Sequence, residues 1–377
     1  MKKTLLITVD FPPGIGGVST YLKELCARLP KEKIVVLAPK SSGSDEFDNG
    51  QSYRIYRKKF FSTSPLIWPK WLHLFLIVRE IIKREGIQQI LVGQILPIGS
   101  VALFFKWVLK IPFVLSTHAM DIIMLKNYRR KTWLARRIIK HARKIITVSE
   151  FTFQALLRLG ADKQKLSIIT PATNIYSEPA PDKQTEIRKR YGLEGKKILL
   201  TIGRLVKRKG HLEVLKSLPE ILEKYPNLAY LVGSDGPEKQ SLKEYVEKFN
   251  LGNYVFFTGE IRKEELPSFY RIADIFIMPT LELDDGDVEG FGIVYLEANA
   301  FAKPVIASKS GGTANAVIDN KTGLLVNPLN PGEIALAVRK LLDDQNLSAK
   351  LGKQGQERVF HNFTWEKQSD LLINALS

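Results

Sequence analysis

The sequence predicts an α/β protein with two doubly wound domains, each a parallel sheet with helices on both faces. Three observations lead to this prediction. Short apolar runs alternate with amphipathic helical patterns along the chain, as in repeated β-α-β units. The 377 residues suit two domains rather than one. A proline-containing stretch, residues 171–182, separates two sets of apolar runs that are too numerous for a single sheet.

Apolar runs predict five strands in the first half of the chain: 4–9, 33–37, 89–92, 112–115 and 144–148. Six more runs follow the proline-containing stretch: 198–202, 228–232, 255–258, 275–278, 304–307 and 323–326. Helical periodicity between the runs predicts helices that include 19–29, 68–84, 212–224, 238–249, 293–301 and 331–342. We therefore divide the chain into an N-terminal domain (1–175), a C-terminal domain (176–362) and a closing helix (363–377) that packs back on the N-terminal domain.

The composition excludes several classes of protein. Hydrophobic residues make up 45% and charged residues 25%, which is typical of a soluble globular chain and not of a disordered one. The single cysteine, Cys26, excludes an intrachain disulfide and a zinc site built on cysteines. The N-terminus does not read as a signal peptide, and no apolar run reaches the length that spans a membrane. We expect a cytoplasmic protein, with peripheral contact to the inner face of the cytoplasmic membrane as an option.

The positive charge is confined to the first half of the chain. Residues 1–180 hold 29 Lys and Arg against 12 Asp and Glu, whereas residues 181–377 hold 27 of each, so the net charge of +17 belongs to the first half. Such asymmetry indicates an anionic partner for that half: nucleic acid, an anionic membrane or a phosphorylated lipid. The alternative is a basic surface that only keeps the protein soluble.

Ligands of open parallel sheets bind at the carboxyl ends of the strands, so we expect functional residues in the loops that follow the strands. The loop after the first strand carries Gly16 and Gly17 and opens a helix, where backbone amides can approach an anion. Its spacing does not match G-x-G-x-x-G, so a dinucleotide fingerprint is not predicted. The alternative is a simple tight turn.

A cationic loop follows the first strand of the second half. Arg204, Lys207, Arg208 and Lys209 lie between Gly203 and Gly210. Arginine can bind phosphate oxygens in a fork and lysine adds a point charge, so this loop suits a diphosphate. The alternative is a solvated run of charge.

An acidic loop, residues 284–289, leads through Gly290 and Gly292 into an apolar helix that contains Glu297. We expect free amides at the helix start, with Glu289 before the helix and Glu297 inside it. Carboxylates can accept hydrogen bonds from hydroxyls while amides donate to phosphate, which suits a phosphorylated, hydroxyl-rich ligand. The ligand spacing of an EF-hand is absent, so no metal site is predicted. The amides in question belong to Phe291, Gly292, Ile293 and Val294.

His118 follows another predicted strand, with Asp121 three residues later. A lone histidine is often structural, but its place at the carboxyl end of a strand favours a functional role.

Together these motifs resemble family 4 of the retaining nucleotide-sugar glycosyltransferases, which have the GT-B fold. The segment EGFGIVYLE, from Glu289 to Glu297, matches the family's pair of glutamates with seven residues between them. Gly203-Arg204-Leu205 with Lys209-Gly210 matches its G-R-L-x-x-x-K-G motif. Gly16-Gly17 and His118 with Asp121 match its glycine and histidine loops, and the resemblance covers the whole chain.

The resemblance implies a cleft between two Rossmann-like domains and a role for each matched residue. Arg204 and Lys209 would bind the donor's diphosphate and stabilise the leaving group. Glu289 would hold sugar hydroxyls and Glu297 the ribose hydroxyls, while the amides of residues 291–294 would hold sugar and phosphate. His118 would line the reacting centre, and Gly16-Gly17 would close over the phosphates. The family needs no metal or other cofactor and retains the anomeric configuration.

Within the family, residues 287–297 are most similar to the GDP-mannose-dependent phosphatidylinositol mannosyltransferases, which implies GDP-mannose as donor. A UDP-sugar donor is the alternative. Many members carry an acidic residue where this chain has Asn315, after Gly311-Gly312.

Since the donor motifs fall in the second half, we expect the first domain to bind the acceptor, a lipid-linked or cell-envelope glycan. Residues 127–144 hold eight Lys and Arg and no acid, and Trp133 lies among them. Trp68 and Trp71 begin another apolar helical pattern. Basic stems beside tryptophan suit an anionic membrane interface. The alternative is that these three tryptophans are core residues of ordinary covering helices.

Two other classes of function remain open at this point. A non-enzymatic protein that binds lipid or nucleic acid on the same scaffold would not require Arg204, Lys209, Glu289 and Glu297 together. Because all four are present, the enzyme is favoured, and no nucleic acid is expected as a partner. Another enzyme on the same fold, such as a phosphorylase or an epimerase, is the third possibility.

Overall fold

The computed structural model describes residues 1–14, 16–61, 71–174 and 181–377. The chain forms two compact units. The first contains Met1–Pro171 and Trp365–Ser377, and the second contains Ala172–Thr364. The domain boundary placed at residues 175 and 176 lies outside the described residues, and so does Trp68.

The first unit is built on a parallel sheet of seven strands in the order β3-β2-β1-β4-β5-β6-β7. Every residue of β1, β2, β4 and β5 is buried, as expected for strands covered on both faces. The strands are β1 (Thr4–Ile7), β2 (Ile34–Ala38), β3 (Arg54–Arg57), β4 (Gln89–Val92), β5 (Phe113–Thr117), β6 (Lys144–Thr147) and β7 (Leu166–Ile168).

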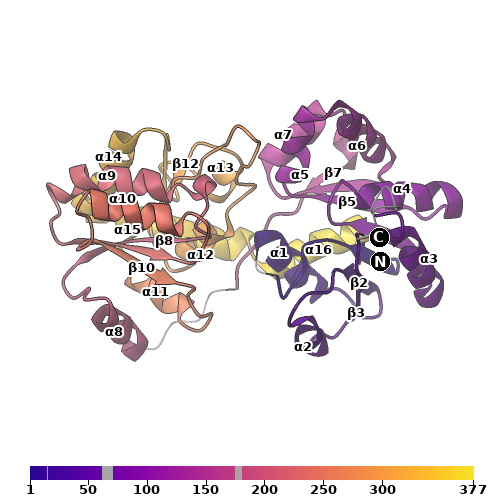
Figure 1. Ribbon diagram of the computed structural model, residues 1–377, viewed down its shortest axis with the longest axis horizontal. Coiled ribbons are helices and arrows are strands. Elements are labelled where there is room, and N and C mark those ends of the chain that lie inside the picture. Colours follow the sequence, from indigo (N-terminus) through magenta and orange to yellow (C-terminus); the bar gives the residue numbers. More distant parts are fainter. Residues whose placement is uncertain (15, 62–70, 175–180) are drawn as a thin grey trace. The chain divides into compact units, whose positions relative to one another are not determined.

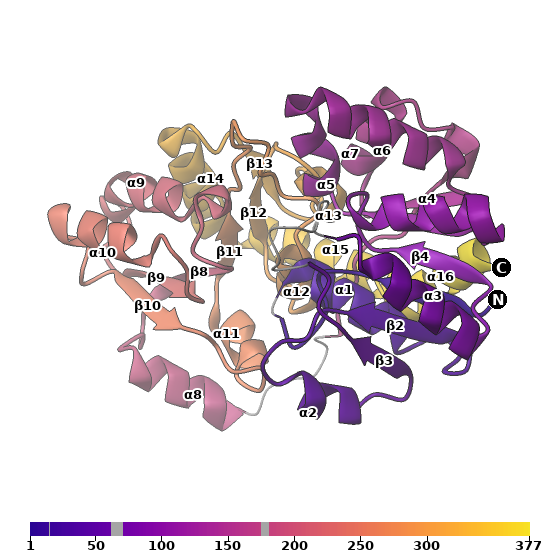
Figure 2. The same cartoon turned by 45° about the vertical axis from the view of Figure 1, so that its right-hand side comes forward.

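Helices cover both faces of this sheet. In Figures 1 and 2, α4, α6 and α7 lie together on one side of the sheet, and α1 and α16 lie on the other. The helices are α1 (Gly17–Cys26), α2 (Ser44–Asn49), α3 (Leu74–Glu85), α4 (Ile98–Leu109), α5 (Met120–Ile123), α6 (Arg129–His141), α7 (Glu150–Arg158) and α16 (Trp365–Leu376).

The C-terminal helix α16 is anchored in the first unit by buried contacts. Trp365 is buried against Tyr21 of α1, with ring centroids 6.1 Å apart. The last carbonyls of the helix accept hydrogen bonds from a side chain of β4, Gln89 Nε2 to Leu376 O at 2.6 Å, and from the residue just before β6, Arg143 Nη2 to Ala375 O at 2.8 Å. These side chains satisfy carbonyls that a helix end leaves without partners.

The second unit is a parallel sheet of six strands in the order β10-β9-β8-β11-β12-β13. Its order reverses between β8 and β11, which is the kind of switch point where open sheets bind ligands. The strands are β8 (Lys197–Ile202), β9 (Leu228–Gly233), β10 (Val255–Gly259), β11 (Ile275–Met278), β12 (Val305–Ser308) and β13 (Leu324–Val326).

Helices α9, α10 and α14 gather on one side of the second sheet, while α8, α11, α12 and α15 lie on the other (Figure 1). The helices are α8 (Pro181–Arg190), α9 (His211–Leu222), α10 (Lys239–Lys248), α11 (Leu266–Ile272), α12 (Ile293–Ala300), α13 (Thr313–Ala316), α14 (Pro331–Asp343) and α15 (Gln345–Asn362). The predicted α/β class and the parallel sheets are confirmed.

Three elements differ from the sequence-based expectation. Strands β3 and β7 were not predicted, because they are short edge strands without a continuous apolar run: β3 reads RIYR and is partly exposed. The helix predicted over 68–84 begins only at Leu74 in the described residues, after a turn over residues 71–73.

Within the part of the chain that the structure describes, no helix has the length and the apolar character needed to cross a membrane.

Candidate active site

The loops at the carboxyl edge of the second sheet bring the cationic and acidic motifs together. The segment between β8 and α9 contains a short 3-10 helix, Lys207–Lys209, and ends at Gly210. Gly210 has a φ of +73°, and a Cβ there would lie 2.0 Å from the carbonyl oxygen of Pro279. Only glycine therefore lets the start of α9 approach the segment that follows β11.

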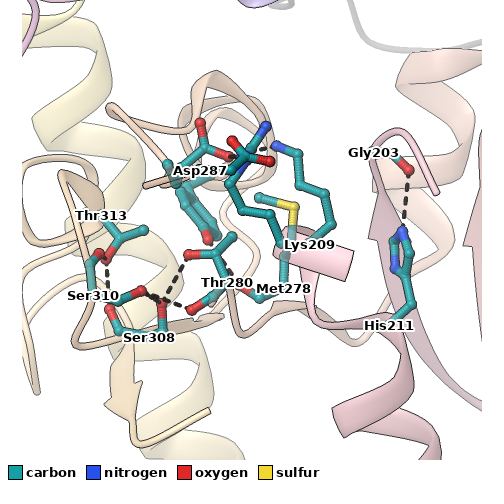
Figure 3. Close-up of polar contacts among 12 residues, drawn as sticks. Gly203, Lys209, His211, Met278, Thr280, Asp287, Ser308, Ser310 and Thr313 are labelled. Carbon is teal, nitrogen blue, oxygen red and sulfur yellow. Dashed lines mark hydrogen bonds and ion pairs between the residues drawn. The ribbon is translucent and has the colours of Figure 1, made fainter. Parts of the chain in front are cut away.

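Two cations and two carboxylates form a linked network at this edge (Figure 3). Glu289 Oε2 accepts from Lys209 Nζ at 2.5 Å and from Arg208 Nη1 at 2.6 Å. Arg208 Nε also donates to Asp287 Oδ1 at 2.8 Å. The side chains of Lys209 and Glu289 are each only 13% exposed, so this is a largely desolvated ion pair.

The network keeps Glu289 ionised. Burial alone would raise the pKa of its carboxyl, but the charges of Lys209 and Arg208 and their hydrogen bonds lower that pKa to about 2. Glu289 is therefore a carboxylate at neutral pH and can accept hydrogen bonds.

Arg204 differs from Arg208 and Lys209 in the same loop. Its side chain is exposed, and no hydrogen bond or ion pair joins it to another of the described residues. Thus the structure brings Lys209 and Glu289 together as neighbours, while Arg204 remains available to an anion. Sequence reasoning did not single out Arg208 and Asp287, because nothing in the sequence shows which cation of the run pairs with which acid.

The start of α12 is uncapped. Within the described part of the chain, no side chain caps the helix at Gly292, so the amides of Ile293 and Val294 in its first turn have no side-chain partner there. Gly292 has a φ of +92°, and a Cβ there would lie 2.3 Å from the Tyr295 ring. Tyr295 in turn donates to the carbonyl of Met278 at 2.7 Å, which ties α12 to the end of β11. Phe291 is buried, and Gly290 is partly exposed.

Glu297 lies deeper in the same helix. Its Oε2 accepts from the Tyr270 hydroxyl at 2.6 Å. Burial raises the pKa of Glu297, and the tyrosine hydrogen bond opposes that rise. Tyr270 is a partner that the sequence did not point to, since it lies 27 residues earlier on α11.

A chain of hydroxyls joins the ends of β11 and β12 (Figure 3). Thr280 Oγ1 lies 2.9 Å from Ser308 Oγ, which lies 2.8 Å from Ser310 Oγ, and Ser310 donates to the carbonyl of Thr280 at 2.7 Å. This network holds the turn that carries Gly311 and Gly312. The amide of Gly312 donates to the main-chain carbonyl of Glu289 at 2.8 Å, so the turn also fixes the backbone of Glu289.

His211, the first residue of α9, is a buried histidine that sequence reasoning missed. Its Nε2 lies 3.2 Å from the carbonyl oxygen of Gly203 (Figure 3), and its Nδ1 is buried without a partner among the described residues. Burial lowers the pKa of His211 to about 4, so the ring is neutral at neutral pH.

The predicted residues of the first unit follow the carboxyl ends of β1 and β5. Asp121 Oδ1 accepts from the backbone amide of His118 at 2.9 Å, and His118 Nε2 lies 3.3 Å from Ser116 Oγ. Burial lowers the pKa of His118 to about 4 and raises the pKa of Asp121 to about 6. Ala119 between them has φ 78° and ψ −67°, a strained conformation of the kind found at functional sites.

A second carboxylate lies at the end of β1. Asp10 Oδ2 accepts from Gln94 Nε2 at 3.0 Å, and Gln94 Oε1 accepts from the amide of Val9 at 3.1 Å. Gly16 and Gly17 are exposed, and α1 starts at Gly17 without a side-chain cap. No role for Asp10 was predicted from the sequence, and Gln94 was missed, since no motif marks it.

Comparison with known proteins identifies the family of the chain. Residues 15–175 match the family described as Glycosyltransferase Family 4, and residues 183–358 match Glycosyl transferases group 1. A GDP-mannose-dependent alpha-(1-6)-phosphatidylinositol monomannoside mannosyltransferase of Mycolicibacterium smegmatis is 31% identical over 99% of this chain and 98% of its own. The chain belongs to glycosyltransferase family 4. The Mycobacterium tuberculosis H37Rv protein of the same name is 32% identical, and the match covers 100% of the present chain and 98% of the M. tuberculosis protein.

Solved structures agree on the fold. Anabaena HepE in complex with UDP and glucose matches with a TM-score of 0.82 at 18% identity. The match covers 100% of the present chain and 99% of the HepE chain. Sucrose-phosphate synthase from Thermosynechococcus elongatus matches with a TM-score of 0.79 at 24% identity. This match covers 99% of the present chain and 98% of the synthase chain. The predicted family and the GT-B architecture of two Rossmann-like domains are thereby confirmed, and membership of this family argues against the alternative of a non-enzymatic binding protein.

Proposed function

We propose that this glycosyltransferase transfers mannose from GDP-mannose to a hydroxyl of a lipid-linked acceptor, with retention of the anomeric configuration. The carrying observation is the network in which Lys209 and Arg208 hold Glu289 beside an exposed, unpaired Arg204. The full-length likeness to GDP-mannose-dependent phosphatidylinositol mannosyltransferases supports the donor and the class of acceptor.

The donor would bind at the carboxyl edge of the second sheet. Arg204 and Lys209 would take the charge of the diphosphate, which favours departure of the nucleotide without a metal ion. The uncapped amides at the start of α12 would donate to phosphate and sugar. Glu289, ionised and largely buried, would accept from sugar hydroxyls, and Glu297 would accept from the ribose.

The acceptor would bind in the first domain. In the proposed step, the bond between the anomeric carbon and the phosphate oxygen breaks, and a bond to the acceptor oxygen forms on the same face of the sugar. The acceptor's proton passes to the departing phosphate oxygen. His118, neutral because it is buried, would hydrogen-bond at the reacting centre, with Asp121 fixing its loop. Gly16 and Gly17 would close over the phosphates.

A thermal-shift panel with GDP, UDP, ADP and their sugar conjugates tests the proposal. A ligand at 100 times its dissociation constant adds about 2.7 kcal/mol of stability, so GDP and GDP-mannose should raise the melting temperature clearly. Lys209→Ala should abolish the shift, whereas Lys350→Gln, at an exposed position of α15, should leave it unchanged. A shift with UDP alone would move the donor to a UDP-sugar, and no shift with any nucleotide would contradict the proposal.

We also propose that the first domain meets an anionic membrane through α6 and the end of α4. Trp133 of α6 and Trp107 of α4 are 59% and 45% exposed, so Trp133 is not a core residue. The guanidinium of Arg137 lies over both rings, 5.3 Å from Trp107 and 5.0 Å from Trp133. Exposed aromatic rings beside cations suit the interface of a bilayer that carries negative lipids.

A further inference from the structure

The two oxygens of the Glu289 carboxylate have different surroundings. Oε2 accepts from both Lys209 and Arg208, while no hydrogen bond from another described residue reaches Oε1. Arg208 itself is fixed from its other side, because its Nε donates to Asp287. Of the two cations on Oε2, Arg208 is therefore also anchored by Asp287, whereas the Lys209 ammonium is the end of a flexible side chain.

We propose that Arg208, anchored by Asp287, is a positioning residue that keeps Glu289 ionised and in place when Lys209 turns to the donor's diphosphate. This inference rests on the proposed function, in which Lys209 binds that diphosphate. Arg208 itself would not touch the donor.

The charges explain why two cations are needed. Arg208 and Lys209 balance Asp287 and Glu289, so the network is neutral before a donor binds. A diphosphate that recruits Lys209 takes one cation from Glu289. Arginine suits the remaining task, because its planar group can hold two carboxylates at once, whereas a lysine ammonium is a compact point charge on a flexible chain.

The groups that face Glu289 leave no other cation for this task among the described residues. Lys209 and Arg208 reach it from the segment between β8 and α9. Tyr295 approaches from α12, but burial and the charge of Glu289 raise its phenol pKa well above the ordinary value, so it carries no charge. Asp287 adds a negative charge from the same loop. Without Lys209 and Arg208, burial and the charge of Asp287 would favour protonation of Glu289.

The first test needs no substrate. Glutamate labelled with ¹³C at the carboxyl carbon, with the Glu289 signal assigned from Glu289→Gln, reports the protonation of Glu289. In Lys209→Gln, which imitates the loss of Lys209, we expect Glu289 to stay ionised down to acid pH. In Arg208→Gln/Lys209→Gln its midpoint should rise by at least about one pH unit. Equal midpoints in the two variants would overturn the inference.

Variants that act on Arg208 more gently guard against misfolding of the double variant. Arg208→Lys in the Lys209→Gln background should restore part of the lower midpoint, because it returns the charge without the fork. Asp287→Asn in the same background frees the guanidinium but also removes a negative charge that favours protonation of Glu289, so its midpoint should stay well below that of Arg208→Gln/Lys209→Gln. An Arg208→Lys/Lys209→Gln variant with the same midpoint as Arg208→Gln/Lys209→Gln would also overturn the inference.

The second test uses turnover with GDP-mannose. In the plot of turnover rate against pH, the acid limb should lie at least about one pH unit higher for Arg208→Gln than for the wild type. In this variant kcat should fall by a larger factor than KM rises. Lys350→Gln removes the same charge from α15 and should leave the limb in place. An acid limb that keeps the wild-type position in Arg208→Gln would count against the inference. A wild type that transfers no sugar would count against the proposed function only, because the carboxyl titration decides the inference by itself.

Discussion

At the scale of single residues, the environments of the buried groups set their charge. Glu289 remains ionised although it is largely buried, because two cations face it. Burial lowers the pKa of His118 to about 4, and burial together with the charge of Lys209 lowers the pKa of His211 to about 4. The two histidines are therefore hydrogen-bonding groups at neutral pH and do not carry charge there.

The lowered pKa of His211 predicts how stability depends on pH. A histidine with a pKa near 6.5 when unfolded and about 4 when folded binds fewer protons in the folded state between these values. The contribution of the neutral His211 to the free energy of unfolding is therefore complete above about pH 6.5 and is lost as the pH falls toward 4. The melting temperature of His211→Gln should fall less over this range than that of the wild type, as measured by calorimetry.

His361→Gln, at an exposed histidine of α15, provides the matched control and should follow the wild-type curve. A wild type and a His211→Gln variant that lose stability in parallel between pH 6.5 and 4 would show that His211 does not carry this dependence.

At the scale of elements, the cationic loop between β8 and α9 depends on a close approach between the start of α9 and the segment after β11. Gly210 permits this approach, with a positive φ and no room for a Cβ beside Pro279. Packing by itself therefore explains the motif's terminal glycine.

Gly210→Ala should destabilise the second domain by at least about 1–2 kcal/mol, because the residue would be strained and its Cβ would meet a main-chain carbonyl. Gly252→Ala is the control, since a Cβ there meets nothing within 4 Å. Its change in stability should stay within about 1 kcal/mol. Urea unfolding measures both, and equal stabilities of the two variants would refute the packing argument.

At the scale of the whole molecule, the net charge of +17 resides in one half of the chain. In the structure this charge includes the exposed Arg130, Lys131 and Arg136 of α6, around the exposed Trp133. A surface of this kind gains about 1 kcal/mol per basic residue near anionic lipid.

Arg130→Glu/Arg136→Glu should weaken binding to vesicles that contain anionic phospholipid by at least about 10-fold at low salt. Flotation with vesicles of phosphatidylglycerol and phosphatidylcholine measures this. Lys31→Glu/Lys33→Glu changes the charge equally at exposed positions between α1 and β2 and should bind nearly as the wild type does. Equal loss in both variants would indicate general charge attraction, and wild-type protein that does not float would refute the membrane proposal.

The sequence by itself determined the fold class, the family and most elements. This was possible because the signals are local: buried parallel strands such as β1 and β4 read as continuous apolar runs. Gly203, Gly210 and Gly292 are also local signals, since each marks a loop between a strand and a helix. Edge strand β3 was missed because a half-exposed strand lacks that apolar run.

Only the tertiary structure decided which charges pair and which side chains are exposed. The sequence presents four cations in one loop without showing that Arg208 and Lys209 meet Glu289 while Arg204 stays unpaired. Nor could it show that Trp133 faces outward or that Tyr270 reaches Glu297. The physical reason is that pairing and burial depend on segments far apart in the chain, and local periodicity carries no information about those distances.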